Sequence, residues 1–373
     1  MQRKKILALA LAAALLCGCQ ATPPEPTPAP DRLTWLHGFY AGSSYGQIGL
    51  VNHMDAVSLG WGQMDVDDAG SLYVNTTYQA GNTWVVPQSP HLATDYFAQR
   101  GIPYNLCVYA SATRAYGETN VLEYLLQEER QDQAADALAS AAEGYSGLTI
   151  DFEGLAAATR QEPFADFVAL VREKLPADKL LYVAVPPQTW YKGYDYRALG
   201  RVCDKVILMA HDYQWQTAPE ENLGTDRTDT PVAPIRLVEQ ALKEITDPDT
   251  GVEDVSKVAL AVAFATAGVE VDEAGLLVGT TVYSPSPETL AARLTQPDAQ
   301  PGWSEEYASP YVYYHNEEGR HYRVWYEDAR SVSAKIRLAY QYGVTSLSLW
   351  RLGTVPDFEA YEAWSAVTDQ RGK

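Results

Sequence analysis

Short apolar runs, each followed by a polar or helix-like stretch, recur along the chain from Thr34 onward. Such a succession is typical of βα units, whose parallel strands are buried on both faces. Eight runs predict eight strands: Trp35–Ala41, Ala56–Trp61, Tyr104–Tyr109, Gly147–Glu153, Leu180–Pro186, Val202–Met209, Val258–Phe264 and Thr345–Trp350. Eight βα units in one chain predict an α/β fold, the (β/α)8 TIM barrel.

The stretches between the runs support this interpretation. The apolar residues of Glu162–Leu175 recur at spacings of three and four residues, which predicts a helix. The segment between the seventh and eighth runs is too long for a plain crossover, and its alternating stretches Tyr311–Tyr314 and His321–Tyr326 predict a hairpin. We therefore expect a barrel over residues 33–373, with a small α+β insertion at about 269–328 that walls one side of a cleft.

The first residues have the layout of an export signal. Cations from Arg3 to Lys5 precede an apolar run, Ile6–Leu16, that is too short to span a membrane. Leu16–Cys19 resembles a bacterial lipobox, in which cleavage leaves the last cysteine as the first mature residue and a diacylglycerol is attached to its sulfur. The alternative is an ordinary secretory signal with two incidental cysteines. The Pro/Thr-rich stretch that follows at once favours the lipobox.

This N-terminal pattern predicts where the protein works. Residues 1–18 are expected to be a lipoprotein signal peptide, and residues 19–32 a lipidated Cys19 with an extended Pro-rich tether. The protein is then extracytoplasmic and lipid-anchored to the bacterial cell membrane. The formal net charge is −20, which repels phosphate backbones and anionic head groups, so we expect a lipid rather than an electrostatic anchor and no nucleic-acid partner. We expect a monomer.

No metal or cofactor chemistry is indicated. The six histidines show no HExxH spacing, and no glycine-rich phosphate loop follows a strand. Cys107 and Cys203 each lie in an apolar run and are expected to be buried thiols rather than a disulfide framework. We therefore expect neither a metal site nor a cofactor.

Two acids on one strand are the most informative residues. Asp151 and Glu153 alternate with apolar neighbours, so they share one strand face, with Cα atoms about 6.5–7 Å apart. Two carboxylates side by side in a barrel mouth cannot both ionise cheaply, so one pKa is raised and a proton stays available near neutral pH. A glycosidic general acid needs this property. The acids alone also fit half of a buried ion pair, or a helix N-cap at the exit of the strand.

Several segments resemble the family-18 glycoside hydrolases, the chitinase-like barrels. Ser146–Glu153 is similar to their D-G-x-D-x-D-x-E strand, Met209–Tyr213 to their Met-x-Tyr-Asp, and Ser348–Gly353 to their terminal Trp segment. Pro231–Ile235 and Trp325–Ser331 resemble the branch associated with bacterial spore germination and cortex peptidoglycan. The order of these segments along the chain adds to the resemblance.

The resemblance implies a glycosidase that cleaves an N-acetylated polysaccharide or oligosaccharide with help from the substrate. The acetamide oxygen of the substrate attacks the anomeric carbon, so no carboxylate of the protein is the nucleophile. Glu153 is then the acid that protonates the leaving oxygen and later the base for water, and Asp151 orients the acetamide. Asp212 would bind the sugar and Trp350 would form its apolar floor. The same segments place His211, Met209 and Tyr213 near the sugar.

The chain also departs from the family pattern. Ser146 and Thr149 stand where the first two motif acids are expected, His211 stands where a tyrosine usually contacts the acetamide, and the seventh strand lacks the expected Gly/Pro/Tyr pattern. These departures leave open a glycan-binding barrel without catalysis and a scaffold lipoprotein that only bridges partners.

Further candidates come from other strand ends. They are Tyr40, Trp61, Gln188 and, in the Trp-Tyr-Glu-Asp segment, Glu327. Residues of these types lie more often in a core or on a surface than in a sugar-binding site.

Overall fold

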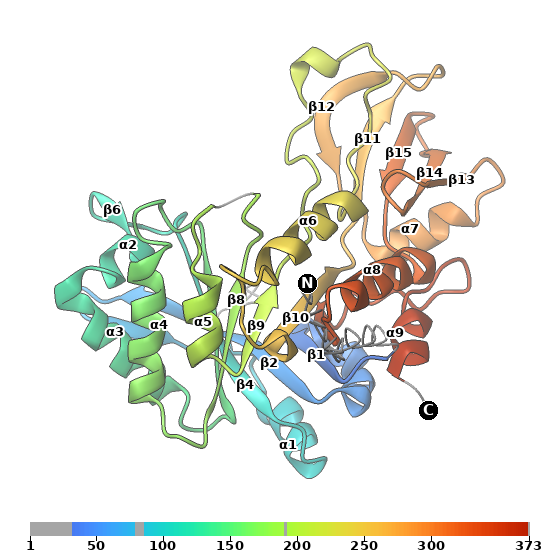
Figure 1. The fold of residues 1–373 in the computed structure, drawn as a ribbon. Helices are drawn as coiled ribbons and strands as arrows, with labels where there is room; N and C mark the ends of the chain where they lie inside the picture. The colour runs from blue at the N-terminus through green and yellow to red at the C-terminus, as the bar shows by residue number, and fades with distance from the viewer. Residues whose placement is uncertain (1–31, 79–85, 190–191, 372–373) are drawn as a thin grey trace, which may run out of the picture.

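The structure, a computed structural model, describes residues 32–78, 86–189 and 192–371 (Figure 1). The expected signal peptide and the expected lipidation site, Cys19, lie outside these ranges. None of the helices in the described ranges combines the length and the apolar composition needed to cross a bilayer.

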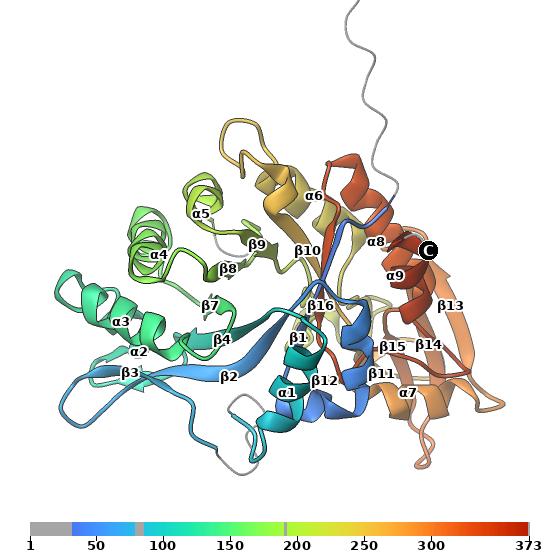
Figure 2. The same cartoon turned by 90° about the horizontal axis from the view of Figure 1, so that it is seen from below.

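Eight parallel strands form a closed barrel. Each pairs in parallel with its neighbours, and β1 pairs with both β2 and β16, which closes the ring (Figure 2). The strands are β1 (Trp35–Tyr40), β2 (Ala56–Val66), β4 (Tyr104–Ser111), β7 (Gly147–Glu153), β8 (Leu180–Val185), β9 (Lys205–Leu208), β10 (Val258–Ala263) and β16 (Ser346–Trp350). The predicted (β/α)8 TIM barrel is confirmed.

Most of the strands agree with the predicted bounds to within two residues, and two differ by more. The sixth strand, β9, begins at Lys205 rather than Val202, because α5 (Tyr196–Val202) occupies the preceding residues. The side chain of Asp195 accepts a hydrogen bond from Ala198 N and so caps that helix. The second strand, β2, continues to Val66, with a bulge between Gly60 and Gly62, and pairs there with the antiparallel β3 (Leu72–Asn75).

Helices cover the outside of the barrel (Figure 2). In α4 (Glu162–Lys174) the residues Phe164, Phe167, Val168 and Val171 are fully buried, as the spacing of its apolar residues predicts. The other helices and short elements are α1 (His91–Gln99), β5 (Ala115–Tyr116), β6 (Thr119–Asn120), α2 (Val121–Leu125), α3 (Glu128–Ala141), α6 (Ile235–Ile245), α8 (Ala329–Gln341), α9 (Trp364–Arg371) and the 3₁₀ helices η1 (Gly42–His53), η2 (Glu220–Asn222) and η3 (Val255–Lys257).

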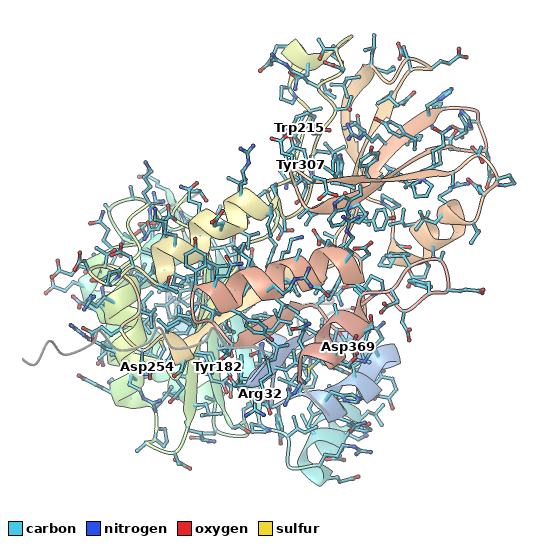
Figure 3. The ribbon with its side chains drawn as sticks, turned by 45° about the vertical axis from the view of Figure 1, so that its right-hand side comes forward. Arg32, Tyr182, Trp215, Asp254, Tyr307 and Asp369 are labelled. Atoms are coloured by element: carbon cyan, nitrogen blue, oxygen red, sulfur yellow. The ribbon has the colours of Figure 1, made fainter. Side chains whose placement is uncertain are left out.

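A second, antiparallel sheet lies between the seventh and eighth barrel strands in the sequence. Its order is β12 (Leu277–Tyr283), β11 (Ala267–Val271), β15 (His321–Trp325), β14 (Ser309–His315) and β13 (Gln300–Ser304), and α7 (Pro287–Leu294) packs beside it. Strands β14 and β15 form a hairpin in which Tyr311 lies opposite Trp325. Figure 3 shows Trp215 and Tyr307 in this part of the molecule, away from Tyr182 of the barrel.

The barrel interior contains a chain of polar side chains. Alternation along β1 places Trp35, His37 and Phe39 inside, with the rings of Trp35 and His37 stacked at 5.2 Å. His37 Nδ1 lies 2.8 Å from Ser348 Oγ, and its Nε2 lies 2.8 Å from Ser58 Oγ. Ser58 Oγ in turn lies 2.6 Å from Thr149 Oγ1. We call this buried chain, Ser348–His37–Ser58–Thr149, the barrel floor.

Candidate active site

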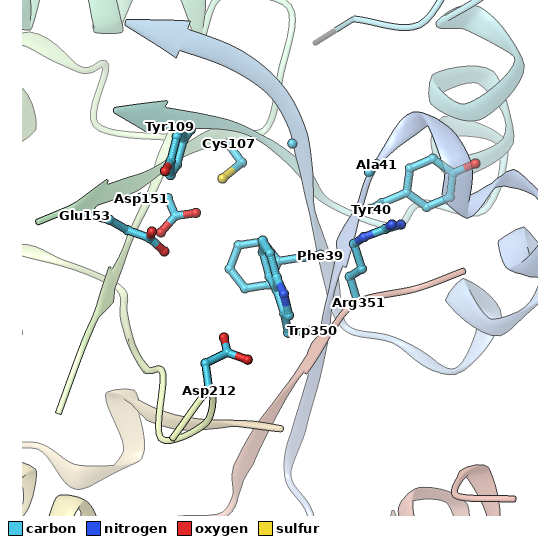
Figure 4. A pocket seen from close by; sticks show the side chains of 11 residues that line it. Phe39, Tyr40, Ala41, Cys107, Tyr109, Asp151, Glu153, Asp212, Trp350 and Arg351 are labelled. Atoms are coloured by element: carbon cyan, nitrogen blue, oxygen red, sulfur yellow. The ribbon is translucent and has the colours of Figure 1, made fainter. Parts of the chain in front are cut away.

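A cleft opens at the carboxyl ends of the barrel strands, where TIM-barrel proteins place their chemistry. One cavity of about 350 Å³ is lined by the residues drawn in Figure 4, which are Phe39, Tyr40, Ala41, Gly60, Cys107, Tyr109, Asp151, Glu153, Asp212, Trp350 and Arg351. A neighbouring hollow of about 340 Å³ is lined by Glu153, Gly154, Pro186, Met209, His211, Asp212, Gln214 and Gln216. Both include Glu153 and Asp212, so these two acids lie where the two parts of the cleft meet.

The two acids of β7 both face this cleft. Asp151 is 3% exposed, whereas Glu153 is partly exposed. Burial, and then the charge of Glu153, raises the pKa of Asp151 well above its usual range. Burial, and then the charge of Asp212, also raises the pKa of Glu153, against the opposing effects of His211 and Tyr109. The pair therefore tends to hold a proton that a solvent-exposed pair would lose.

Tyr109 holds Glu153 in place from the neighbouring strand. Its side chain is hydrogen-bonded to that of Glu153. Tyr109 lies opposite Asp151 in the β4–β7 register, and Ser111 lies opposite Glu153. Tyr109 was not among the candidates from the sequence, although the alternation of Asn105, Cys107 and Tyr109 along the third apolar run is a signal that places it on an inner face.

Asp212 faces Glu153 from the loop after β9. Its φ is 62°, in the left-handed region that few residues other than glycine adopt. His211 Nδ1 lies 2.7 Å from Asp212 Oδ2. Burial acts to raise the pKa of Asp212, but the charge of His211 and hydrogen bonds from His211 and Gln214 hold it below its usual range. Asp212 is therefore an ionised acid beside an acid that tends to keep its proton.

Among the buried polar atoms of the cleft lining that make no hydrogen bond to any residue in the described ranges, two belong to residues beside Glu153 and Asp212. They are Oδ1 of Asp151 and Nε2 of His211. A buried polar group without a partner is costly, and such groups are rare in folded proteins. Both atoms belong to residues that line the cleft, so a polar ligand there would supply the missing partners.

Aromatic rings form one side of the cleft. The Trp350 ring is partly exposed, meets the Phe39 ring at 5.0 Å, and stacks at 6.4 Å on the ring of His211. An exposed indole face of this kind suits the apolar face of a pyranose ring. Phe39 was not proposed from the sequence, although alternation along β1 places it inside with His37.

The two aromatic candidates Tyr40 and Trp61 lie in different places relative to the cleft. The Tyr40 ring lines the cavity at its edge, but Tyr40 is only 2% exposed and packs against Phe97 at 5.3 Å. Trp61 is fully buried and does not line the cleft. The bulge at Gly60–Gly62 leaves Gly60 on the cleft and turns Trp61 outward beneath the covering segments.

Three other candidates lie outside the cleft. Gln188 bonds within its own loop, donating to Tyr194 O at 2.9 Å and accepting from Gly193 N. Glu327 is 2% exposed and lies 2.7 Å from Lys335 Nζ in a buried ion pair. The hydroxyl of Tyr213 donates to Leu237 O at 3.4 Å. These contacts hold the three side chains in the fold, so we do not assign them to sugar binding. Met209 and His211, by contrast, line the cleft.

The two hydroxyl substitutions in the motif have structural partners. Ser146 Oγ accepts a hydrogen bond from Tyr104 N at 3.0 Å, and Thr149 belongs to the barrel floor. Neither position leaves a charge beneath Asp151. The acid that acts on the pKa of Asp151 is therefore Glu153, two residues further along the same strand.

A closed (β/α)8 barrel that carries two neighbouring acids at the end of β7 is an arrangement typical of glycosidases. Comparison with protein families leads to the same class. The profile "Glycosyl hydrolases family 18" matches residues 119–354, and the chain belongs to this family. The resemblance noted from the sequence is thereby confirmed.

Relatives of this chain include proteins named for sporulation and for lysis of cortical fragments, in agreement with the branch that the sequence resembles. The chain is 31% identical over 219 residues to YdhD of Bacillus subtilis, named as a sporulation-specific glycosylase, covering 56% of this chain and 47% of that protein. It is 26% identical over 236 residues to the cortical fragment-lytic enzyme of Bacillus subtilis, covering 61% and 50%. The chain thus spans about half the length of these curated relatives.

A solved structure confirms the fold. A chitinase from Chromobacterium violaceum superposes with a TM-score of 0.69 at 23% identity, covering 91% of this chain and 99% of that chain.

Proposed function

We propose that this protein is a retaining glycosidase that cleaves β-1,4-linked glycans containing N-acetylglucosamine. The observation that carries the proposal is the pair of Asp151 and Glu153, whose raised pKa values favour keeping a proton on the pair, at a cavity of about 350 Å³. A peptidoglycan-derived substrate is favoured over chitin, because the relatives include a cortical fragment-lytic enzyme.

The proposed reaction uses the substrate's own acetamide. Its oxygen attacks the anomeric carbon as the glycosidic bond breaks, and Glu153 gives its proton to the leaving oxygen. Asp151 hydrogen-bonds the acetamide N–H and stabilises the oxazolinium ion that forms. Water then attacks the anomeric carbon and returns a proton to Glu153, which restores both the acid and the acetamide with retention of configuration.

The neighbours of the pair have supporting roles. Tyr109 holds the Glu153 carboxyl by a hydrogen bond. Ionised Asp212 disfavours a second negative charge on Glu153 and so helps it to keep its proton. The Trp350 ring supports the sugar above the barrel floor.

Product analysis tests this proposal. The protein is incubated with muropeptide fragments and with chitooligosaccharides, and products are identified by mass. We expect new reducing ends from the wild type and at least a hundredfold fewer from Glu153→Gln, whose carboxamide cannot give the proton. Tyr342→Phe, which changes a partly exposed tyrosine hydrogen-bonded to Glu239 and away from the cleft, serves as the control and should cleave normally. Equal cleavage by Glu153→Gln would refute the assignment.

A second function has its own support. Ser146, Thr149 and His211 replace residues that the family pattern expects, and this favours a glycan-binding protein without catalysis. That protein would bind N-acetylated oligosaccharides measurably in calorimetry, and the same mass analysis would find no cleavage of any of them.

For the N-terminal segment we propose a lipid anchor at Cys19 on the outer face of the cell membrane. The support is the lipobox-like Leu16–Cys19 and the Pro-rich stretch behind it. Cys19→Ala should move the protein from the sedimented membrane fraction into the supernatant and abolish incorporation of labelled fatty acid. Retention of the label in the variant would exclude lipidation at this residue.

A further inference from the structure

The charged side chains that line the first cavity are three acids and one guanidinium. Arg351 follows Trp350 and lines the same cavity as Asp151, Glu153 and Asp212. It is the one cationic side chain among the lining residues of that cavity in the described ranges. The protein as a whole carries a formal charge of −20, so a cation at this position changes the local potential strongly.

Arg351 is fixed by the segment beside it. Its Nη1 donates to Ser43 Oγ at 2.8 Å and lies 3.4 Å from Leu352 O. The segment η1 is tied to the same region, since Gln47 Nε2 donates to Val355 O at 2.7 Å and Gln47 Oε1 accepts from Gly353 N at 2.8 Å. The guanidinium is therefore held in one place at the wall of the cavity.

Arg351 is also partly buried, and burial lowers the pKa of its guanidinium. A half-buried cation is stabilised by an anion that shares its environment, and a guanidinium binds a carboxylate by two parallel hydrogen bonds.

The cavity is polarised from one end to the other. Figure 4 shows Asp151, Glu153 and Asp212 on one side of Phe39 and Trp350, and Arg351 with Tyr40 on the other. A hollow of about 240 Å³ behind Tyr40 includes Tyr45 and Leu92, which are 51% and 50% exposed, and leaves room for a substituent beyond the sugar. Negative charge on a substrate is disfavoured at the acids and favoured at Arg351.

We propose that Arg351 binds a carboxylate carried by a sugar of the substrate, so that the cleft selects acid-bearing N-acetylated glycans over neutral ones. This inference rests on the proposed glycosidase function and adds a specificity-determining residue to it. In peptidoglycan the carboxylate belongs to the lactyl ether of N-acetylmuramic acid or to the peptide that extends from it. Chitin carries no such group.

The test compares kcat/KM on two kinds of soluble oligosaccharide. One is a chitin tetramer, and the other is a tetramer that alternates N-acetylglucosamine with N-acetylmuramic acid, used with a free lactyl carboxylate, with a lactyl methyl ester and with a dipeptide. Arg351→Gln should lower the ratio of kcat/KM for acid-bearing over neutral substrate about ten- to a hundredfold, the range for a hydrogen bond to a charged group. Methyl esterification should lower the wild-type ratio similarly. If the dipeptide substrate alone responds, the carboxylate bound is that of the peptide.

Matched variants separate charge from structure. Arg351→Lys keeps the charge but not the fork and should lower the ratio less than Arg351→Gln. Ser43→Ala removes the hydroxyl that accepts a hydrogen bond from Arg351. This variant tests whether η1 must hold the guanidinium in place for the ratio to be high. Arg330→Gln changes an exposed arginine that pairs with Glu305 and should leave the ratio and the activity unchanged. A structural role of Arg351 would lower kcat/KM on both substrates equally, which would overturn the inference.

Failure of the proposed function is recognised separately. If the wild type cleaves neither substrate, the glycosidase assignment fails, and the inference is decided by calorimetric Kd values for the two tetramers. Tighter binding of the acid-bearing tetramer that Arg351→Gln removes supports it. Equal Kd values, or cleavage confined to chitin tetramers, overturn it.

Discussion

The barrel floor and the cleft above it both contain buried polar groups, but they satisfy them differently. In the floor, both ring nitrogens of His37 have hydroxyl partners at 2.8 Å. In the cleft, Asp151 Oδ1 and His211 Nε2 have no partner in the described ranges. A satisfied network stabilises the fold, whereas unsatisfied groups cost stability and are kept where a ligand completes them. We infer from this difference that the barrel floor supports the site, whereas the cleft is where a ligand binds.

The two regions also respond to acid in opposite directions. Burial, and then the charge of Lys205, lowers the pKa of His37 to about 3, so the unfolded chain binds this proton more readily, and stability is lost as the pH falls below about 6.5. The raised pKa values of Asp151 and Glu153 mean that the folded chain binds their protons more readily, so these acids add stability as the pH falls.

The largest effect is expected from Glu153→Gln, which breaks the cleft and spares the floor. The variant loses general acid catalysis, so kcat on a cleaved glycan should fall about 10²- to 10⁴-fold. It also removes a carboxyl that burial disfavours when charged, so the free energy of unfolding at pH 7 should equal or exceed that of the wild type. Urea unfolding followed by circular dichroism measures the second quantity. A less stable variant would mean that Glu153 is part of the structural network.

The next effect is expected from Asp151→Asn. The amide retains the shape but cannot supply the negative charge that stabilises the oxazolinium ion, and kcat should fall about 10²- to 10³-fold. Because the Glu153 carboxyl loses its acidic neighbour, it should ionise more easily. The alkaline side of the pH–rate profile should therefore fall at a lower pH than in the wild type. Steady-state rates between pH 4 and 9 measure both changes. An unchanged profile with unchanged kcat would separate Asp151 from the chemistry.

A stability effect of intermediate size is expected in the floor, from His37→Leu. The substitution leaves Ser348 and Ser58 without their imidazole partner and should cost about 1–3 kcal/mol of unfolding free energy at pH 7. It also removes a group that gains a proton on unfolding, so the loss of stability between pH 6 and pH 4 should be smaller than in the wild type by up to about 1.4 kcal/mol per pH unit. Urea unfolding at pH 4, 5, 6 and 7 gives both. An unaltered slope would show that His37 is not the buried neutral base described here.

The smallest effect is expected from Thr149→Val, at the point where the two regions meet. Loss of the hydroxyl removes the hydrogen bond to Ser58 and the longer one from Asn105 Nδ2 but keeps the volume, and we expect a cost of about 1 kcal/mol. Activity should fall no more than a few-fold, because Thr149 has no place in the proposed chemistry. Unfolding and kcat measured on the same preparation check this, and a hundredfold loss of kcat would show that the floor takes part in catalysis.

The sequence alone was sufficient for the strands and the acid pair. A strand of a buried parallel sheet is a continuous apolar run, and alternation within Gly147–Glu153 places Asp151 and Glu153 on one face whatever surrounds them. The same local rule, applied to the first strand, would have favoured Phe39 over Tyr40. Those conclusions need only neighbouring residues, because the geometry of a strand has a period of two.

The tertiary structure alone decided which distant residues meet the acids. Tyr109 reaches Glu153 through the register between β4 and β7, and Arg351 shares their cavity because β1 closes the barrel onto β16. Trp61 and Glu327 were weaker candidates than Trp350, and the structure places neither in the cleft: a bulge turns Trp61 outward, and Lys335 on α8 pairs with Glu327. Register, bulges and partners from other elements depend on the packing of the whole barrel, and no local pattern of residues encodes them.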